Sequence, residues 1–287
     1  MTEAFYITDL HGSMDRYSKL FQAIRDEKPG VVFLGGDLLP SCFRALEGGR
    51  PGPDDFIRDF LGPALSEIRT LMGKDYPNVF AILGNDDLRA EEAAMRAIEE
   101  RGLLSYIHGR KVPLASWVVY GYSYVNPSPF LLKDWERYDV SRYVDLGCVS
   151  PEEGHRSVHA TPDEQRFTTI KEDLDQLTAG EDLANAVFLF HAPPHATDLD
   201  RAALDGKLIE GIQPDVHVGS IAIRRFIEER QPLLTLHGHI HESAGLTGSW
   251  RQQIGRTWMF SAAHDGPDLA LVRFSLENPD KASRELI

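Results

Sequence analysis

The chain has 287 residues, and its 44 acidic against 30 basic side chains give a formal net charge of −14 at neutral pH. This acidic balance argues against a protein that wraps an extended nucleic acid, which needs a basic surface, but it is compatible with a small phosphorylated substrate. The content of 42% hydrophobic residues and the mean hydropathy of −0.28 are typical of globular proteins. No apolar run is long enough to cross a membrane and the start lacks a signal-peptide pattern, so we expect a cytoplasmic protein with no membrane partner.

The first third of the chain alternates strand-like and helix-like segments. Strands are expected at Phe5–Thr8, Val31–Leu34 and Val79–Leu83, and helices from about Met14, over Asp55–Leu71 and over Leu88–Glu100. This alternation is typical of a parallel sheet with helices outside it.

Strand-like segments dominate next and suggest a second sheet packed on the first. They are Ile107, Lys111–Pro113 and Trp117–Tyr124. A helix at Glu164–Leu177, a strand at Val187–Phe190, a helix at Gly219–Glu229 and strands at Leu233–Leu236, Trp258–Ser261 and Leu269–Ser275 complete the pattern. We therefore expect an α/β protein in which residues 1–287 form a single domain.

Two stretches do not fit a minimal core. One is the Gly- and Pro-rich segment 41–54, which contains Cys42, a cysteine expected to be a thiol. The other is an insertion at about 123–163, whose aromatic content argues against simple disorder. This insertion is interpreted as a lid, as a surface of a homo-oligomer or as a plain surface loop, and the sequence leaves these three open.

Each of five expected strands is followed by residues that can bind a metal ion. These residues form the motifs Asp9-Leu10-His11, Gly36-Asp37, Gly84-Asn85, His191 and Gly238-His239-Ile240-His241. Because the carboxyl ends of parallel strands meet at one edge, we expect a single site. Imidazole, carboxylate and amide ligands suit divalent manganese, iron, zinc or nickel, and one carboxylate can bridge two ions in a hydrolytic centre.

Each motif alone has a simpler interpretation. Asp9 could cap the helix that follows Ser13, Gly36-Asp37 could be an ordinary turn, and His191 could be a hydrogen-bonded structural histidine. Five such signals in order, each after a strand, favour the metal site over these alternatives.

This ordered set resembles the calcineurin-like metallophosphoesterase superfamily, and the resemblance extends from Asp9 to His241. The His-Ala-Pro-Pro and Gly-His-Ile-His-Glu-Ser segments are similar to its small bacterial and archaeal branch. The resemblance implies a four-layer sandwich of two mixed sheets flanked by helices, and two divalent ions. It assigns one ion to Asp9, His11 and His241, the other to Asn85, His191 and His239, and the bridge to Asp37.

The resemblance also implies a metal-dependent phosphoric ester hydrolase that uses a metal-activated water. A phosphodiester is favoured as substrate because an acidic chain without evident arginine clamps suits a singly charged phosphate. A phosphomonoesterase or nucleotide hydrolase at the same site is the alternative. An interaction module that binds metal and catalyses weakly is the alternative of another class, but all seven ligand residues are present.

One position departs from the family pattern. Asp86 stands where many members carry a histidine that protonates the leaving group, and a carboxyl group is ordinarily ionised at neutral pH. The proton donor therefore stays open among His237, His195, His217 and a metal-bound water, or the substrate needs none. Asp86 itself could donate only if burial or a neighbouring anion raised its pKa. His195 and His217, together with Asn85, are also candidate substrate contacts, and Asp87 is expected to cap the helix Leu88–Glu100.

Overall fold

Two mixed six-stranded sheets stack face to face in the computed structural model, which describes residues 2–41 and 55–287. The first sheet has the order β12 (Asn278–Leu286), β11 (Ala270–Ser275), β1 (Glu3–Ile7), β2 (Val31–Gly35), β3 (Asn78–Ile82), β4 (Ser105–Tyr106). The second has the order β5 (Arg110–Leu114), β6 (Trp117–Tyr122), β7 (Ala186–Phe190), β8 (Leu234–His237), β10 (Thr257–Ser261), β9 (Arg251–Ile254). In each sheet four neighbouring strands are parallel, β1 to β4 and β6-β7-β8-β10.

The strand sequences explain why both faces of each sheet are covered. Along β1, Ala4 and Tyr6 join the apolar cluster between the sheets, whereas Phe5 and Ile7 join the cluster that includes the helices. All five residues of β2 and of β7 are buried. Strands buried on both faces are typical of parallel sheets with helices outside them.

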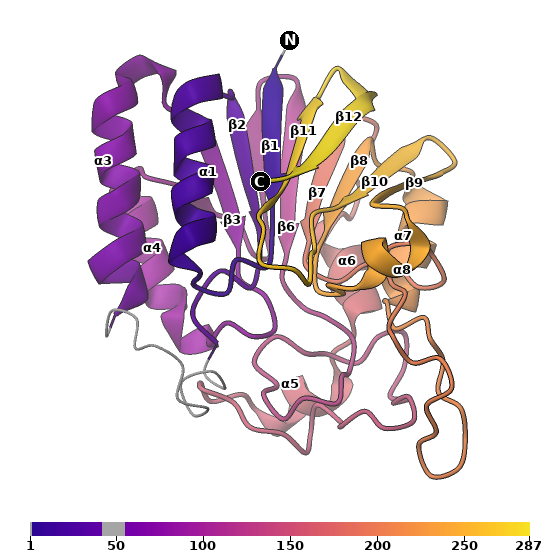
Figure 1. The fold of residues 1–287 in the computed structure, drawn as a ribbon. Helices are drawn as coiled ribbons and strands as arrows, with labels where there is room; N and C mark the ends of the chain where they lie inside the picture. The colour runs from indigo at the N-terminus through magenta and orange to yellow at the C-terminus, as the bar shows by residue number, and fades with distance from the viewer. Residues whose placement is uncertain (1, 42–54) are drawn as a thin grey trace.

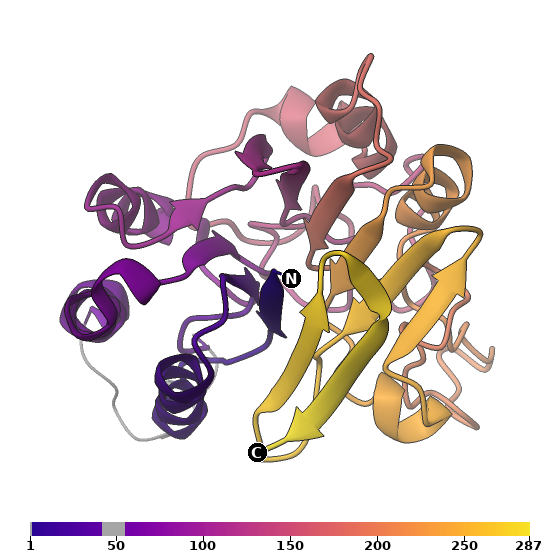
Figure 2. The ribbon, with the colours of Figure 1, turned by 90° about the horizontal axis from the view of Figure 1, so that it is seen from above.

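The helices form the two outer layers (Figures 1 and 2). Beside the first sheet lie α1 (Met14–Glu27), the π-helical turn η1 (Ile57–Leu61), α3 (Gly62–Met72) and α4 (Glu92–Glu100). Beside the second sheet lie α6 (Ile170–Leu177) and α7 (Ile221–Arg230). Shorter elements are η2 (Gly73–Asp75), η3 (Arg89–Glu91), α5 (Pro162–Phe167) and α8 (Ser243–Thr247). This is the expected four-layer α/β sandwich.

The helix expected at 164–177 is wrong as a continuous element. The chain is extended at Thr168 and Thr169, so that α5 ends and α6 begins anew. The hydroxyl of Thr169 accepts from the backbone N–H of Glu172 at 3.1 Å and caps α6. Thr169 also forms an isolated β-bridge with Tyr138. A β-branched residue with a capping hydroxyl is better suited to this boundary than to a helix interior.

The segment 123–163 is irregular but is held by buried polar contacts. Nζ of Lys133 lies 2.5 Å from Glu136, and both side chains are fully buried. The carboxylate of Asp139 accepts from the hydroxyl of Ser220 at 2.5 Å and from the backbone N–H of Ile221 at 2.7 Å, at the start of α7. This segment is therefore anchored to the second sheet's helix layer.

Two expectations need separate mention. Cys42 and all but the first residue of the segment 41–54 lie outside the described residues. Within the described ranges, no helix has both the length and the apolar character that a membrane span requires.

Candidate metal centre

The loops that leave β1 and β2 run side by side beyond the ends of these strands. The backbone N–H of Asp9 donates to Gly36 O at 3.0 Å, and that of His11 donates to Asp37 O at 2.8 Å. These bonds continue the pairing of the two strands and bring Asp9, His11 and Asp37 to the same edge. The cap of α1 is Ser13, so the capping interpretation of Asp9 is wrong.

Several candidate ligands have left-handed backbone conformations. The φ angles of Asp9, His11, Asp37 and His239 are 56°, 45°, 49° and 71°. Such conformations are uncommon outside glycine and cluster at functional sites. The surrounding hydrogen bonds hold them in place and aim the side chains inward.

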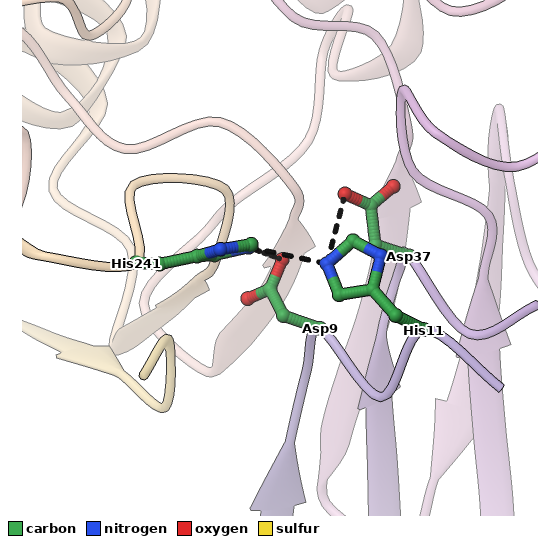
Figure 3. A group of neighbouring side chains, drawn as sticks. All are labelled: Asp9, His11, Asp37 and His241. Carbon is green, nitrogen blue, oxygen red and sulfur yellow. Dashed lines mark hydrogen bonds and ion pairs between the residues drawn. The ribbon is translucent and has the colours of Figure 1, made fainter. Parts of the chain in front are cut away.

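Four side chains form a tight cluster at this edge (Figure 3). Ligand atoms of Asp9, His11, Asp37 and His241 all lie within 4.8 Å of one another. Nε2 of His241 is 3.2 Å from Oδ1 of Asp9 and 3.2 Å from Nε2 of His11. These are the side chains that the first motifs and the last motif were expected to bring together.

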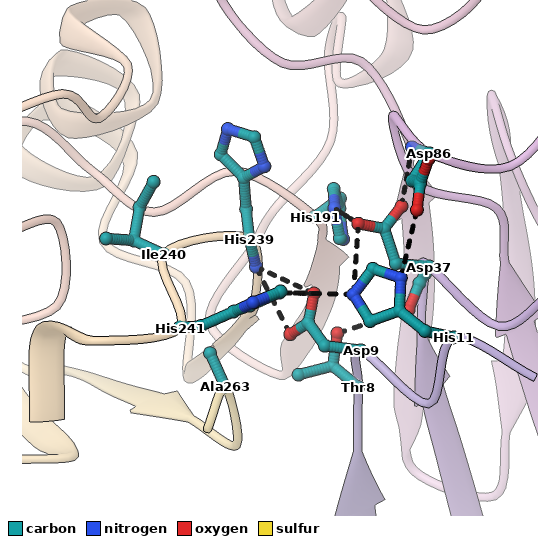
Figure 4. Close-up of polar contacts among 12 residues, drawn as sticks. Thr8, Asp9, His11, Asp37, Asp86, His191, His239, Ile240, His241 and Ala263 are labelled. Atoms are coloured by element: carbon teal, nitrogen blue, oxygen red, sulfur yellow. Dashed lines mark hydrogen bonds and ion pairs between the residues drawn. The ribbon is translucent and has the colours of Figure 1, made fainter. Parts of the chain in front are cut away.

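A second group, made of Asn85, His191 and His239, lies next to this cluster, and Figure 4 shows His191 beside Asp37. Nε2 of His191 is 3.3 Å from Oδ2 of Asp37 and 3.0 Å from Oδ1 of Asn85. Nδ1 of His191 donates to Gly35 O at 2.8 Å, which leaves Nε2 free to face these oxygens. The ring of His239 is 5.3 Å from that of His191 between centroids.

Asp37 occupies the middle of the two groups. Its Oδ1 accepts from the backbone N–H of Asp86 at 2.8 Å. Its Oδ2 lies 3.3 Å from Nε2 of His191 and 3.9 Å from Nε2 of His11. One carboxylate oxygen therefore faces the free nitrogens of two imidazoles, as a bridging ligand would.

The glycines of the motifs permit this close approach. A Cβ on Gly84 would collide with the carboxylate of Asp37 and would lie 2.7 Å from Cε1 of His191. A Cβ on Gly238 would collide with the hydroxyl of Thr8. The glycines before Asn85 and His239 are therefore needed because a side chain at either position would collide with its neighbours.

Without a metal ion, protons bind to this cluster. Burial lowers the pKa of His11, but the hydrogen bond to Asp86 and the charges of Asp37 and Asp9 outweigh burial and raise it to about 9. Burial likewise lowers the pKa of His191, and the charge of Asp37 outweighs it and raises the pKa to about 9. Burial and the charge of His191 lower the pKa of His239 to about 3.

The residues fit divalent metal ions. Asp9 and Asp37 are almost completely buried, and buried carboxylates need positive partners. Lone-pair atoms converge from several directions, including the two Nε2 atoms of His11 and His241 at 3.2 Å. Imidazole and carboxylate donors with fixed outer hydrogen bonds are the ligand set of zinc, manganese and iron sites.

Three of the predicted catalytic or substrate residues lie elsewhere. His237 is fully buried, with Nδ1 2.9 Å from Ala192 O and Nε2 2.7 Å from the hydroxyl of Thr235, so a role for it as proton donor to a substrate is wrong. Nε2 of His195 is 3.4 Å from Asp215. Nδ1 of His217 is 2.8 Å from the buried Asp200.

Asp86 and Asp87 follow Asn85, and their carboxylates contact other parts of the site. Oδ2 of Asp86 lies 3.1 Å from Nδ1 of His11, and a role for Asp86 as acid stays a prediction. The carboxylate of Asp87 accepts from the backbone N–H groups of Leu38, Leu39 and Gly84 at 3.1, 2.8 and 2.9 Å, so it does not cap the following helix. Asp87 instead joins the loops that carry Asp37 and Asn85.

A cavity of about 650 Å³ opens beside the cluster. It is lined by His11, Asp86 and His241 from the cluster side. Arg16 and His264 also line it, and both are functional candidates that the sequence analysis missed because neither follows a strand in a recognised motif. In the described part of the chain, His195, His217 and His237 are not among its lining residues.

The comparisons with known proteins agree with this architecture. The sequence matches the family model of calcineurin-like phosphoesterases over residues 5–243. No curated protein matches it. Among solved structures, one crystal structure has a TM-score of 0.59 at 15% identity, with 99% of this chain and 98% of that chain covered. The protein TT1561 of Thermus thermophilus has a TM-score of 0.54 at 13% identity, with 99% and 98% covered. At these identities the structural likeness shows the fold alone.

Proposed function

The chain belongs to the calcineurin-like phosphoesterase family, and from this membership we propose that it is a binuclear-metal phosphodiesterase. The observation that supports this most directly is the convergence of Asp9, His11, Asp37 and His241 within 4.8 Å at the edge shared by both sheets. Asn85, His191 and His239 would hold the second ion, with Asp37 as the bridge. Divalent ions in such a site lower the pKa of water and neutralise the charge of a phosphate.

The chain's own side chains would orient the substrate. Oδ1 of Asn85 faces His191, so its amide Nδ2 is left to donate to a phosphate oxygen. Arg16 lines the cavity, but its guanidinium donates to Asp9 O at 2.6 Å and to Gly266 O at 2.5 Å. This arginine joins two loops of the site.

The charge of the cavity supports a diester over a monoester. Asp15, Asp86 and Asp265 line it together with Arg16. A phosphomonoester carries a second negative charge that these carboxylates would repel, whereas a diester carries one. The cavity volume falls in the range of small-molecule sites, which suits one alcohol or nucleoside group of such a diester.

His264 is the proposed donor of a proton to the leaving group. In the described chain it is the one histidine that lines the cavity without belonging to the proposed ligand set. Its Nδ1 is 3.7 Å from a carboxylate oxygen of Asp265, which also lines the cavity. The acid would thus come from the loop after β10 instead of from position 86.

A substrate panel tests the function. Metal-stripped protein is loaded separately with Mn²⁺, Ni²⁺, Fe²⁺ or Zn²⁺ and assayed with aryl diesters, cyclic nucleotides and the matching monoesters. We expect metal-dependent cleavage with kcat/KM higher for diesters. Faster cleavage of monoesters would favour the phosphomonoesterase alternative, and tight metal binding without turnover of any ester would favour the interaction module.

A further inference from the structure

Asp86 has contacts that the proposed reaction does not explain. Its Oδ2 accepts from Nδ1 of His11 at 3.1 Å (Figure 4). Its Oδ1 accepts from the hydroxyl of Ser41 at 3.0 Å. Both oxygens act as acceptors, so the carboxylate is held in one orientation. An imidazole at this position would lack both acceptor oxygens and the negative charge.

The contact determines which nitrogen of His11 is free. When Nδ1 carries the hydrogen that points at Asp86, the nitrogen left to bind a metal ion is Nε2, which faces His241 and Asp37. A carboxylate that holds the far side of a histidine ring fixes its tautomer and strengthens it as a metal ligand.

Asp86 acts on the bridge residue as well. Its backbone N–H donates to Oδ1 of Asp37 at 2.8 Å. This bond leaves Oδ2 of Asp37 facing His11 and His191. One residue therefore orients one candidate ligand through its side chain and another through its backbone.

The two halves of the site differ in this respect. Nδ1 of His191 donates to the neutral carbonyl of Gly35 at 2.8 Å, whereas Nδ1 of His11 donates to a charged carboxylate. We propose that Asp86 is a positioning residue that fixes His11 and makes the Asp9, His11 and His241 position the tighter of the two metal positions. The inference rests on the metal centre of the proposed function, but not on its reaction.

Metal titrations without substrate test this inference. Metal-stripped wild type and Asp86→Ala are titrated with Mn²⁺ by calorimetry and with Co²⁺ by visible absorption, which reports the ligand field. We expect the tighter step to weaken about 10–100-fold and the Co²⁺ spectrum of that step to change, while the weaker step stays close to that of wild type. Asp86→Asn, which keeps one acceptor oxygen, is expected to restore part of the affinity.

Asp215→Ala is the matched control, because Asp215 is also a carboxylate beside a histidine, His195, but lies outside the cluster. Its two metal affinities are expected to equal those of wild type. Unchanged affinities in Asp86→Ala, or equal weakening of both steps, would overturn the inference. If Asp86→Ala fails to fold, wild-type metal affinities in Asp86→Asn would overturn the inference in the same way.

The outcomes separate this inference from the proposed reaction. A protein that cleaves no ester, but loses its tight step in Asp86→Ala, contradicts the phosphodiesterase and supports the positioning role. If the protein is a metal-dependent phosphodiesterase and its metal affinities are unchanged in Asp86→Ala, only the positioning role is contradicted.

Discussion

Oδ2 of Asp37, at the end of β2, lies 3.3 Å from Nε2 of His191, at the end of β7 in the other sheet. The proposed site therefore joins the two sheets at one edge, with Asp9 and His11 from one side and His239 and His241 from the other. Metal ions held there would bind the folded chain and not the unfolded chain, so they would stabilise the fold.

Replacing the bridge is the most direct test of the ligand assignment. Asp37→Ala is expected to lose both tightly bound ions and nearly all hydrolysis, because the Asp37 carboxylate faces both His11 and His191. The metal analysis is done by mass spectrometry after gel filtration, with circular dichroism to show that the fold is intact. Two tightly bound equivalents of metal in this variant would contradict the bridge.

The raised pKa values of His11 and His191 make metal binding depend on pH. Both are about 9 without metal, against about 6.5 for an unperturbed histidine. At neutral pH a metal ion must displace these protons, so metal affinity should increase as the pH rises from about 7 to 9. Calorimetry in buffers of different ionisation enthalpy should show proton release that falls to about half at pH 9 and continues to fall above it.

The same shifts predict the opposite trend for the stability of the metal-free protein. The charged imidazoles are favoured in the folded state, so their contribution is complete below about pH 6.5 and is lost as the pH rises through about 9. The Tm of metal-free protein should fall over this interval, by an amount that corresponds to a few kcal/mol. A constant Tm would contradict the interaction of these histidines with Asp37 and Asp86.

Gly84 tests the steric argument for the motifs. Gly84→Ala places a methyl group against Asp37 and His191, so we expect metal affinity to fall at least about tenfold, as for the loss of an outer partner of a ligand. Gly245→Ala is the control, since a Cβ at Gly245 meets nothing within 4 Å. Wild-type metal affinity in Gly84→Ala would show that the loop can move aside without loss.

The strand positions and the order of the ligands could be predicted because they depend on local patterns. Apolar β-branched runs indicated the central strands, and polar residues at their ends indicated Asp9, Asp37 and His191. The roles of Asp86 and Asp87 could not be predicted, because most of their partners are 45 to 75 residues away in sequence. His264 was missed for the same reason, since only the folded chain places it in the cavity with His11.

The buried pair in the segment 123–163 predicts a stability effect without loss of metal. Lys133→Met leaves the carboxylate of Glu136 buried without its cation and should destabilise the fold by about 3–5 kcal/mol. Burial raises the pKa of Glu136 to about 7 despite the charge of Lys133, so the loss should be greater above pH 7 than below it.

Urea unfolding at both pH values measures the effect of Lys133→Met. The control is Lys171→Met, which removes an exposed partner of Asp175 and should change stability by less than about 1 kcal/mol. The double variant Lys133→Met, Glu136→Leu should recover most of the lost stability, because it removes the unpaired charge. None of the residues 123–163, all of which the structure describes, lines the cavity, so metal affinity should be unchanged.

The leaving-group dependence distinguishes the proposed proton donor. An aryl oxygen departs with little protonation, whereas an alkoxide needs an acid, and general acid catalysis is typically worth about 10²–10⁴-fold. If His264 supplies that proton, His264→Ala should slow alkyl diesters by about this factor and leave aryl diesters much less affected. His217→Ala is the control, since that ring is bonded to Asp200 and does not line the cavity in the described structure.

Two other outcomes for His264→Ala would assign the ring differently. Equal slowing of alkyl and aryl diesters would show that this ring binds the substrate. A wild-type protein with a steep dependence on leaving-group acidity, unchanged in His264→Ala, would show that no side chain supplies the proton. Asp86→His, which restores the family histidine, then becomes the decisive variant. It should speed the cleavage of alkyl diesters only if the added acid catalysis outweighs the loss of the carboxylate that contacts Nδ1 of His11.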